Sequence, residues 1–328
     1  MTKTDEFLER TGPAYPRHAI KEAGAKKMPI PNKPKEDLSE FFSSSHDLYL
    51  TGGFVTHGGL KNGKSFFAAT ASSCWPDGLK MEEARSIESI GEDRWRKLKP
   101  VRLEDLIWLP YDLGALDGFP QFKIEVPSLD VRAIIKKFNA PLGVRKVNQT
   151  IQLWVEQNQK TKWVVEDTTS AKDRLLLEYF DSHPVMNRQG EEDKYAKYGS
   201  LKSAHIASHN ALRNSGLTVH YLCHSKAAPE ATTPHQKHVD QTMELPSANT
   251  EIEPEITGQS LKVYLGDASV IGVLVASELP GKPGKYKREY MPFGGKNFTG
   301  GNRLQSLLKT SMPPHMGEMI KMMRKAVE

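Results

Sequence analysis

Residues 58–65 read Gly-Gly-Leu-Lys-Asn-Gly-Lys-Ser and match the phosphate-loop pattern G-x-x-x-x-G-K-[ST] at every fixed position. In such a loop, backbone N–H groups bind phosphate, the lysine reaches the outer phosphates, and the last hydroxyl binds magnesium. The same stretch contains Asn62-Gly63, a strong signal for a two-residue β-hairpin turn. The two interpretations predict different folds, because a phosphate loop joins a buried parallel strand to a helix, whereas a hairpin joins two antiparallel strands.

The flanking residues favour the hairpin. Gly53–His57 is short and polar for a central strand, and Phe66–Thr70 begins with two aromatic residues that suit a strand. The sequence therefore predicts strand-turn-strand at 58–65. The alternative is a magnesium-nucleotide site, with Asp112 or Asp267 as the aspartate that holds the metal. Its phosphate-loop residues are Gly58, Gly63, Lys64 and Ser65.

The rest of the chain predicts an α+β protein with a mainly antiparallel, sheet-rich core and several helices. Thr150–Val155 alternates apolar and polar residues and is expected to pair with Lys162–Glu166 as a hairpin. Leu261–Leu265 and Val270–Ala276 are expected to pair in the same way. Strands and helices do not alternate steadily, which disfavours a doubly wound parallel sheet. Helices are expected near 79–98, 130–138, 168–180 and 200–213, with Ser128 as the cap of the second. Strands are expected at 106–109 and 217–223.

Composition divides the 328 residues into four segments. Residues 1–46 form a Pro- and Lys-containing arm, 47–224 an α+β core, and 225–258 a polar linker or surface excursion. Residues 259–328 hold a hairpin, a basic glycine-rich loop with aromatic residues, and a C-terminal helix that can belong to the same core. No apolar run approaches about 18 residues, and no apolar signal segment stands near Met1. An intracellular protein, cytoplasmic or nuclear, is therefore expected.

Positive charge is concentrated at the C-terminal end. The chain has a net charge of +5, and residues 279–328 carry ten basic against three acidic side chains. Cations interleaved with aromatic rings are typical of nucleic-acid binding, because cations neutralise phosphates and rings stack on bases. The candidate nucleic-acid-binding residues are Lys282, Lys285, Tyr286, Lys287, Arg288, Tyr290, Lys296, Phe298 and Arg303.

Histidines give a third hypothesis. Six of the eleven fall within residues 205–238, four of them in segments predicted as helix and strand and two in the polar tract at 225–258. His205 and His209 share a helix face, and His220 and His224 share a strand face, so the four can build a tetrahedral zinc site. The simpler interpretation places them as ordinary helix and strand residues.

These patterns favour a protein that binds and assembles without catalysing a reaction. The predicted partner is nucleic acid or another polyanion, and the predicted class is a nucleoprotein subunit or a viral capsid, matrix or movement protein. Copies are expected to associate through the arm at 1–46, and no cofactor is expected. The alternatives are a nucleotide-binding enzyme that uses residues 58–65 with a magnesium-nucleotide, and a zinc protein that uses the histidines.

Overall fold

A computed structural model describes residues 53–60, 62–70, 106–120, 126–158, 163–187, 189–193, 195–227, 252–294, 298–303, 311–316, 319–320 and 322–323. All of them belong to one compact unit, Ser44–Glu328. The arm at 1–46, the helix expected near 79–98 and Lys296 lie outside the described residues.

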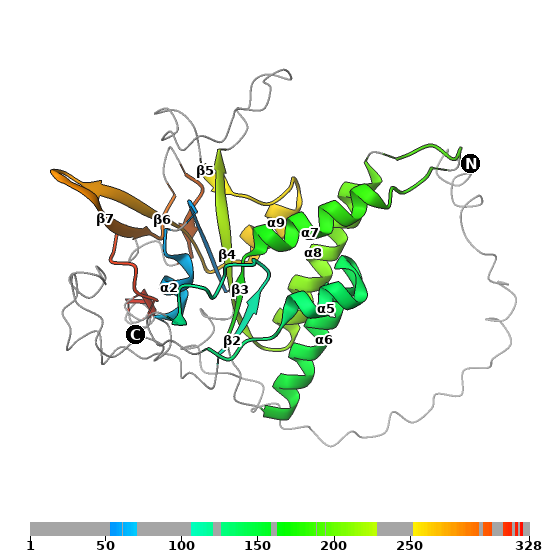
Figure 1. Cartoon of the computed structure of the whole chain (residues 1–328), viewed down its shortest axis with the longest axis horizontal. Helices are drawn as coiled ribbons and strands as arrows, with labels where there is room; N and C mark the ends of the chain where they lie inside the picture. The colour runs from blue at the N-terminus through cyan, green and yellow to red at the C-terminus, as the bar shows by residue number, and fades with distance from the viewer. Residues whose placement is uncertain are drawn as a thin grey trace, which may run out of the picture. The chain divides into compact units, whose positions relative to one another are not determined.

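Among the described residues, an eight-stranded sheet organises this unit, with the strand order β2-β3-β4-β1-β6-β7 (Figure 1). The short strands β5 and β8 pair with β4 and β6. The neighbouring strands β2, β3, β4, β1 and β6 are all parallel, and β7 is antiparallel to β6. The expected mainly antiparallel core is therefore wrong. The strands are β1 (Phe54–Gly58), β2 (Leu106–Pro110), β3 (Trp163–Asp167), β4 (Thr218–Ala227), β5 (Ile252–Pro254), β6 (Val270–Leu279), β7 (Lys282–Met291) and β8 (Gly301–Asn302).

Hydrophobic clusters cover both faces of the sheet, as a parallel sheet requires. Adjacent strand residues point to opposite faces, so Phe54 joins one cluster and Val55 the other. The Phe54 face packs against the helix after β1 and against Met316, Met319 and other residues near the C-terminus. The helices are α2 (Lys64–Ala69), α5 (Val131–Phe138), α6 (Ala140–Asn158), α7 (Thr169–Ser182), α8 (Ala196–Asn214) and α9 (Ser260–Asp267).

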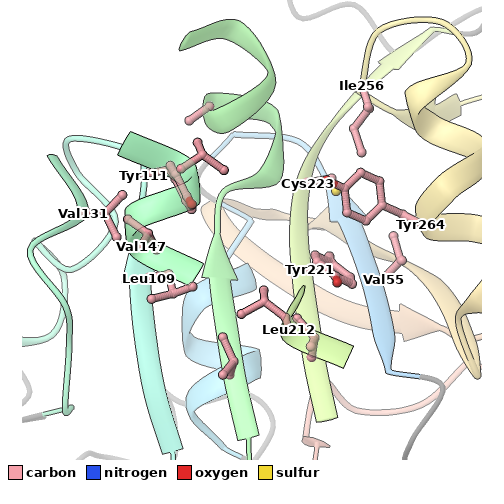
Figure 2. Packing of buried hydrophobic residues seen from close by; sticks show 14 of the residues in the cluster. Val55, Leu109, Tyr111, Val131, Val147, Leu212, Tyr221, Cys223, Ile256 and Tyr264 are labelled. Carbon is pink, nitrogen blue, oxygen red and sulfur yellow. The ribbon is translucent and has the colours of Figure 1, made fainter. Parts of the chain in front are cut away.

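The Val55 face is covered by α5 to α9. Figure 2 shows Val55, Tyr221 and Cys223 on the strands directed towards Tyr264 of α9, and all four side chains belong to one buried cluster. Strand β2 reads as a nearly continuous apolar run because both of its faces are buried, and β1 is buried along its whole length although it carries Thr56 and His57. No helix among the described residues is long and apolar enough to cross a membrane.

Three segments expected as hairpin strands are helical instead. Thr150–Val155 lies within α6, Leu261–Leu265 within α9, and Phe66–Ala69 within α2. In α6, Ile151 is fully buried while Leu153 is 56% exposed, so the apolar alternation that suggested a strand places Leu153 on the solvent side of a helix. The predicted hairpins were wrong because a short alternation of apolar and polar residues fits both a strand and a helix when one of the apolar residues is exposed.

Other elements are where the sequence predicts them. Strands β2 and β4 and helices α7 and α8 occupy the expected segments. The side chain of Thr168 accepts a hydrogen bond from the backbone N–H of Ala171, which caps α7. Helix α5 begins after Asp130, whose carboxylate accepts from Ala133 N–H, rather than after the expected cap Ser128.

Candidate nucleotide-binding site

Residues 58–65 form a strand-loop-helix, so the predicted hairpin is wrong. Strand β1 is buried along its whole length between β4 and β6, and α2 begins at Lys64 directly after the loop. Gly63 has φ of +90° at the start of α2, a conformation that glycine adopts readily. After Asn62-Gly63 the chain therefore enters a helix and not a second strand.

The loop is fastened to the neighbouring strand β6. The Asn62 side-chain amide donates to the backbone oxygen of Leu274 at 3.1 Å. At Gly58 an added Cβ would lie 2.6 Å from the same oxygen, so a larger residue there would push the loop away from β6. Glycine at position 58 therefore allows the close approach of the two strands on which the loop conformation depends.

Lys64 is buried inside the loop. Its Nζ donates to the backbone oxygens of Gly58 at 3.0 Å and Gly59 at 2.9 Å, and its exposure is 6%. Burial lowers the pKa of Lys64, and the nearby carboxylate of Asp167 opposes that shift. Among the described residues, the ammonium group bonds two backbone oxygens and lies 3.5 Å from His224 Nδ1, while carboxylates such as Asp167 act on it from further away. A bound phosphate would supply a close counter-charge.

Asp167 ends β3 and faces the loop. Its Oδ2 accepts a hydrogen bond from Ser65 Oγ at 2.6 Å and another from the indole of Trp108 at 3.2 Å. The carboxylate is 2% exposed, and burial raises its pKa to about 6 although these donors and Lys64 lower it. Asp167, rather than Asp112 or Asp267, therefore meets the loop hydroxyl. The apolar run Trp163–Val165 followed by acidic residues was the sequence signal that could have identified it.

Asp112 and His224 complete the same edge of the sheet, where the carboxyl ends of parallel strands meet. His224 Nδ1 lies 3.5 Å from Lys64 Nζ, and its Nε2 lies 3.3 Å from Asp112 Oδ2. Burial, followed by the charge of Lys64, lowers the pKa of His224 to about 4, so the imidazole is neutral at pH 7. Because Lys64 can only donate, Nδ1 accepts and Nε2 donates its proton to Asp112.

The basic segment predicted to be a nucleic-acid-binding loop is largely strand β7. Tyr290 is fully buried and its hydroxyl accepts from Thr56, while Lys287 pairs with Glu289 at 2.9 Å. Arg303 donates to the backbone oxygens of Gly266 and Asp267. Lys282, Lys285, Tyr286 and Arg288 also lie on β7, and Phe298 packs its ring against Phe293.

The four histidines considered for zinc have separate partners. His205 contacts Asp173 and Tyr264, and His209 contacts Tyr221 and Asp267. His220 bonds Thr56 at 2.8 Å within the sheet, and only His224 lies at the phosphate loop. Within the described ranges no three His, Cys, Asp or Glu side chains are grouped so that they could hold a metal ion.

Among known proteins, the likenesses found are to solved structures. No protein-family model and no curated protein sequence matches the chain. The crystal structure of a KaiC-like protein from the hyperthermophilic archaeon Pyrococcus horikoshii OT3 is similar, with 12% identity and a TM-score of 0.35 over 73% of this chain and 77% of that one. Because both values are low, the fold assignment rests on the strand pairing described above.

The predicted non-enzymatic assembly protein of viral or nucleoprotein type is wrong. The residues chosen for nucleic-acid contact include a buried core tyrosine, Tyr290, and side chains already paired within the fold. The phosphate-loop string is instead built as a strand, a loop and a helix, with Lys64, Ser65 and Asp167 together at the carboxyl edge of a parallel sheet. This arrangement favours the nucleotide-binding alternative.

Proposed function

We propose that this chain binds and hydrolyses a magnesium-bound nucleoside triphosphate at residues 58–65. The observation that carries the proposal is the 2.6 Å hydrogen bond between Ser65, the last residue of the phosphate-loop string, and Asp167 at the end of β3. A phosphate-loop string alone is a weak signal. An aspartate from another strand that meets the loop hydroxyl supplies the second half of a magnesium-phosphate site.

The donor set fits magnesium. Ser65 Oγ and Asp167 Oδ2 are hard oxygen ligands already side by side, and Mg²⁺ is usually bound through one or two protein oxygens together with substrate phosphates and water. When bound, the metal would neutralise charge on the outer phosphates. Lys64 would exchange its bonds to Gly58 and Gly59 for phosphate oxygens, and the loop N–H groups would bind the inner phosphates.

Hydrolysis needs a group that orients the attacking water, and Asp112 fits this role better than Glu166. Glu166 is fully buried and paired with Lys172 at 2.6 Å, so it does not reach water. The Asp112 side chain is 36% exposed at the carboxyl edge and is held by His224 beside Lys64. Asp112 would accept the water proton as oxygen attacks the terminal phosphorus, and the nucleoside diphosphate would leave with the bond electrons.

Binding tests the first half of the proposal. Titration of ATP or GTP with Mg²⁺ into the full chain, followed by calorimetry, should give saturable binding. Lys64→Ala should abolish binding without unfolding the protein, whereas Lys262→Ala, which removes an exposed lysine on α9, should bind normally. Absence of binding by the unmodified protein at millimolar nucleotide would end the proposal.

Phosphate release tests the second half. Asp112→Asn should lower kcat by about 100-fold or more while nucleotide affinity stays near that of the unmodified chain, because general-base contributions are about 10²–10⁴-fold. Unchanged kcat would remove Asp112 from the reaction.

The expected association of copies also stays a prediction, and light scattering with and without nucleotide would check it.

A further inference from the structure

Strand β7 reaches the phosphate loop through one arginine. Arg288 Nε donates a hydrogen bond of 3.1 Å to the backbone oxygen of Asn62. A Cβ added to Gly63 would meet the same Nε at 3.5 Å, so the guanidinium lies directly beside the last glycine of the loop. Arg288 is 226 positions away from Asn62 in sequence, and its side chain is half-buried.

The antiparallel strands β6 and β7 therefore both contact the loop at the same residue, Asn62. Leu274 on β6 accepts from the Asn62 side chain, while Arg288 on β7 donates to the Asn62 backbone. Leu274 is paired with Tyr290 in the ladder, and Arg288 with Ala276, which fixes the two groups relative to each other. The hydrogen bond from Arg288 to the loop backbone has a charged donor. Such a bond is stronger than a hydrogen bond between two uncharged groups.

We propose that Arg288 is a positioning residue that strengthens phosphate binding by its own chain's loop. This inference rests on the nucleotide-binding function proposed above. The Asn62 oxygen and the Gly63 N–H belong to one peptide unit and point in opposite directions in a trans peptide. A cation on the oxygen polarises the unit, so the Gly63 N–H becomes a stronger donor towards phosphate on the other side.

The identity of the side chain matters for this role. Guanidinium keeps its charge at every relevant pH, and its planar nitrogens hold a fixed direction that an ammonium group does not. The neighbouring Lys287 carries the same charge but is exposed and forms an ion pair with Glu289 at 2.9 Å. Lys287 is therefore a matched control, because its removal changes the net charge equally and leaves the loop contact in place.

Nucleotide affinity measured for diphosphate and triphosphate separately tests the proposal. Arg288→Ala should weaken ADP and ATP by a similar factor of about tenfold, because the bond lost is charge-assisted and acts on the part of the loop that binds the inner phosphates. Arg288→Lys should recover part of the loss, and Lys287→Ala should bind like the unmodified chain. The thermal midpoint of each free variant, measured in parallel, separates unfolding from weakened binding.

Three results would overturn the inference. Unchanged affinity in Arg288→Ala would show that the contact does not act on the loop. Weakened ATP with normal ADP would assign Arg288 to the terminal phosphate, and a fall in kcat at normal affinity would assign it to the chemical step. If Arg288→Ala does not fold, Arg288→Lys and Arg288→Gln are compared in the same way. The proposed function itself fails separately, if the unmodified chain binds no nucleotide.

Discussion

Burial raises the pKa of Asp167 to about 6, although Ser65, Lys64 and Trp108 all act to lower it. In the unfolded chain the group has its ordinary pKa of 3.8. Between these two values the folded state binds more protons than the unfolded state, so this group's contribution to stability falls as pH rises from about 4 to about 6. Above that window the ionised carboxylate lowers the stability of the free protein.

Asp167→Asn should therefore stabilise the free protein at pH 7.5 by about 3 kcal/mol, since one pKa unit corresponds to about 1.4 kcal/mol. The gain over the unmodified chain should shrink at pH 5, where Asp167 is already protonated. The same variant should lose magnesium-dependent nucleotide binding. Urea denaturation at both pH values checks the stability, with Asp117→Asn, an exposed aspartate, as control. A pH-independent difference would show that burial of the charge is not its cause.

At the scale of elements, a buried ion pair joins β3 to α7. Lys172 Nζ lies 2.6 Å from Glu166 Oε2, both side chains are fully buried, and Ser208 on α8 accepts a second bond from the ammonium group. Lys172→Met should lower the free energy of unfolding by about 3–5 kcal/mol, because it leaves an unpaired buried carboxylate. Adding Glu166→Gln should restore most of that loss. Additive losses in the double variant, measured by urea denaturation, would contradict this account.

A second contact between elements is steric. A Cβ on Gly272 of β6 would fall 2.4 Å from the ring and hydroxyl of Tyr290 on β7, and Tyr290 is fully buried. Gly272→Ala should therefore cost about 1–3 kcal/mol through overpacking. Gly266→Ala is the matched control, because nothing lies within 4 Å of its added Cβ and the residue is in a helix. Equal thermal midpoints for the two variants would show that the Tyr290 ring moves aside freely.

Element types followed from the sequence only where a local signal was unambiguous. Thr168 caps α7, and the apolar run of β2 has no helical competitor, so both elements were predicted in place. In α6 the alternation around Leu153 arises because that apolar side chain is exposed, which no local pattern reveals. Asn62-Gly63 led to a wrong hairpin prediction, because the dipeptide does not determine which element follows the turn.

At the scale of the whole molecule, strand order was beyond prediction because it depends on partners far apart in sequence. β1 pairs with Thr218–Ala227 on one side and Val270–Leu279 on the other, and both pairings are parallel. The candidate site likewise depends on residues that are far apart in sequence. The loop half, Lys64 and Ser65, is local and was named from its pattern, whereas Asp167 lies 102 positions from Ser65 and is placed there only by the sheet.

Because the site joins the ends of four parallel strands, nucleotide binding should stabilise the whole unit. A ligand at 100 times its dissociation constant adds about 2.7 kcal/mol to the free energy of unfolding. For a unit as long as Ser44–Glu328 this corresponds to a rise in thermal midpoint of about 5 °C. The rise should require Mg²⁺. Without the metal, the negative charges of the phosphates and of the Asp167 carboxylate beside Ser65 would repel each other.

Differential scanning fluorimetry with ATP, with and without Mg²⁺, measures this shift. Lys64→Ala should show none, and Lys262→Ala should show the full rise. At pH 5.5 the magnesium-dependent part should shrink, since Asp167 has a pKa of about 6 and is then largely protonated. A shift of the same size in Lys64→Ala would mean that nucleotide stabilises the protein from somewhere other than the loop at 58–65.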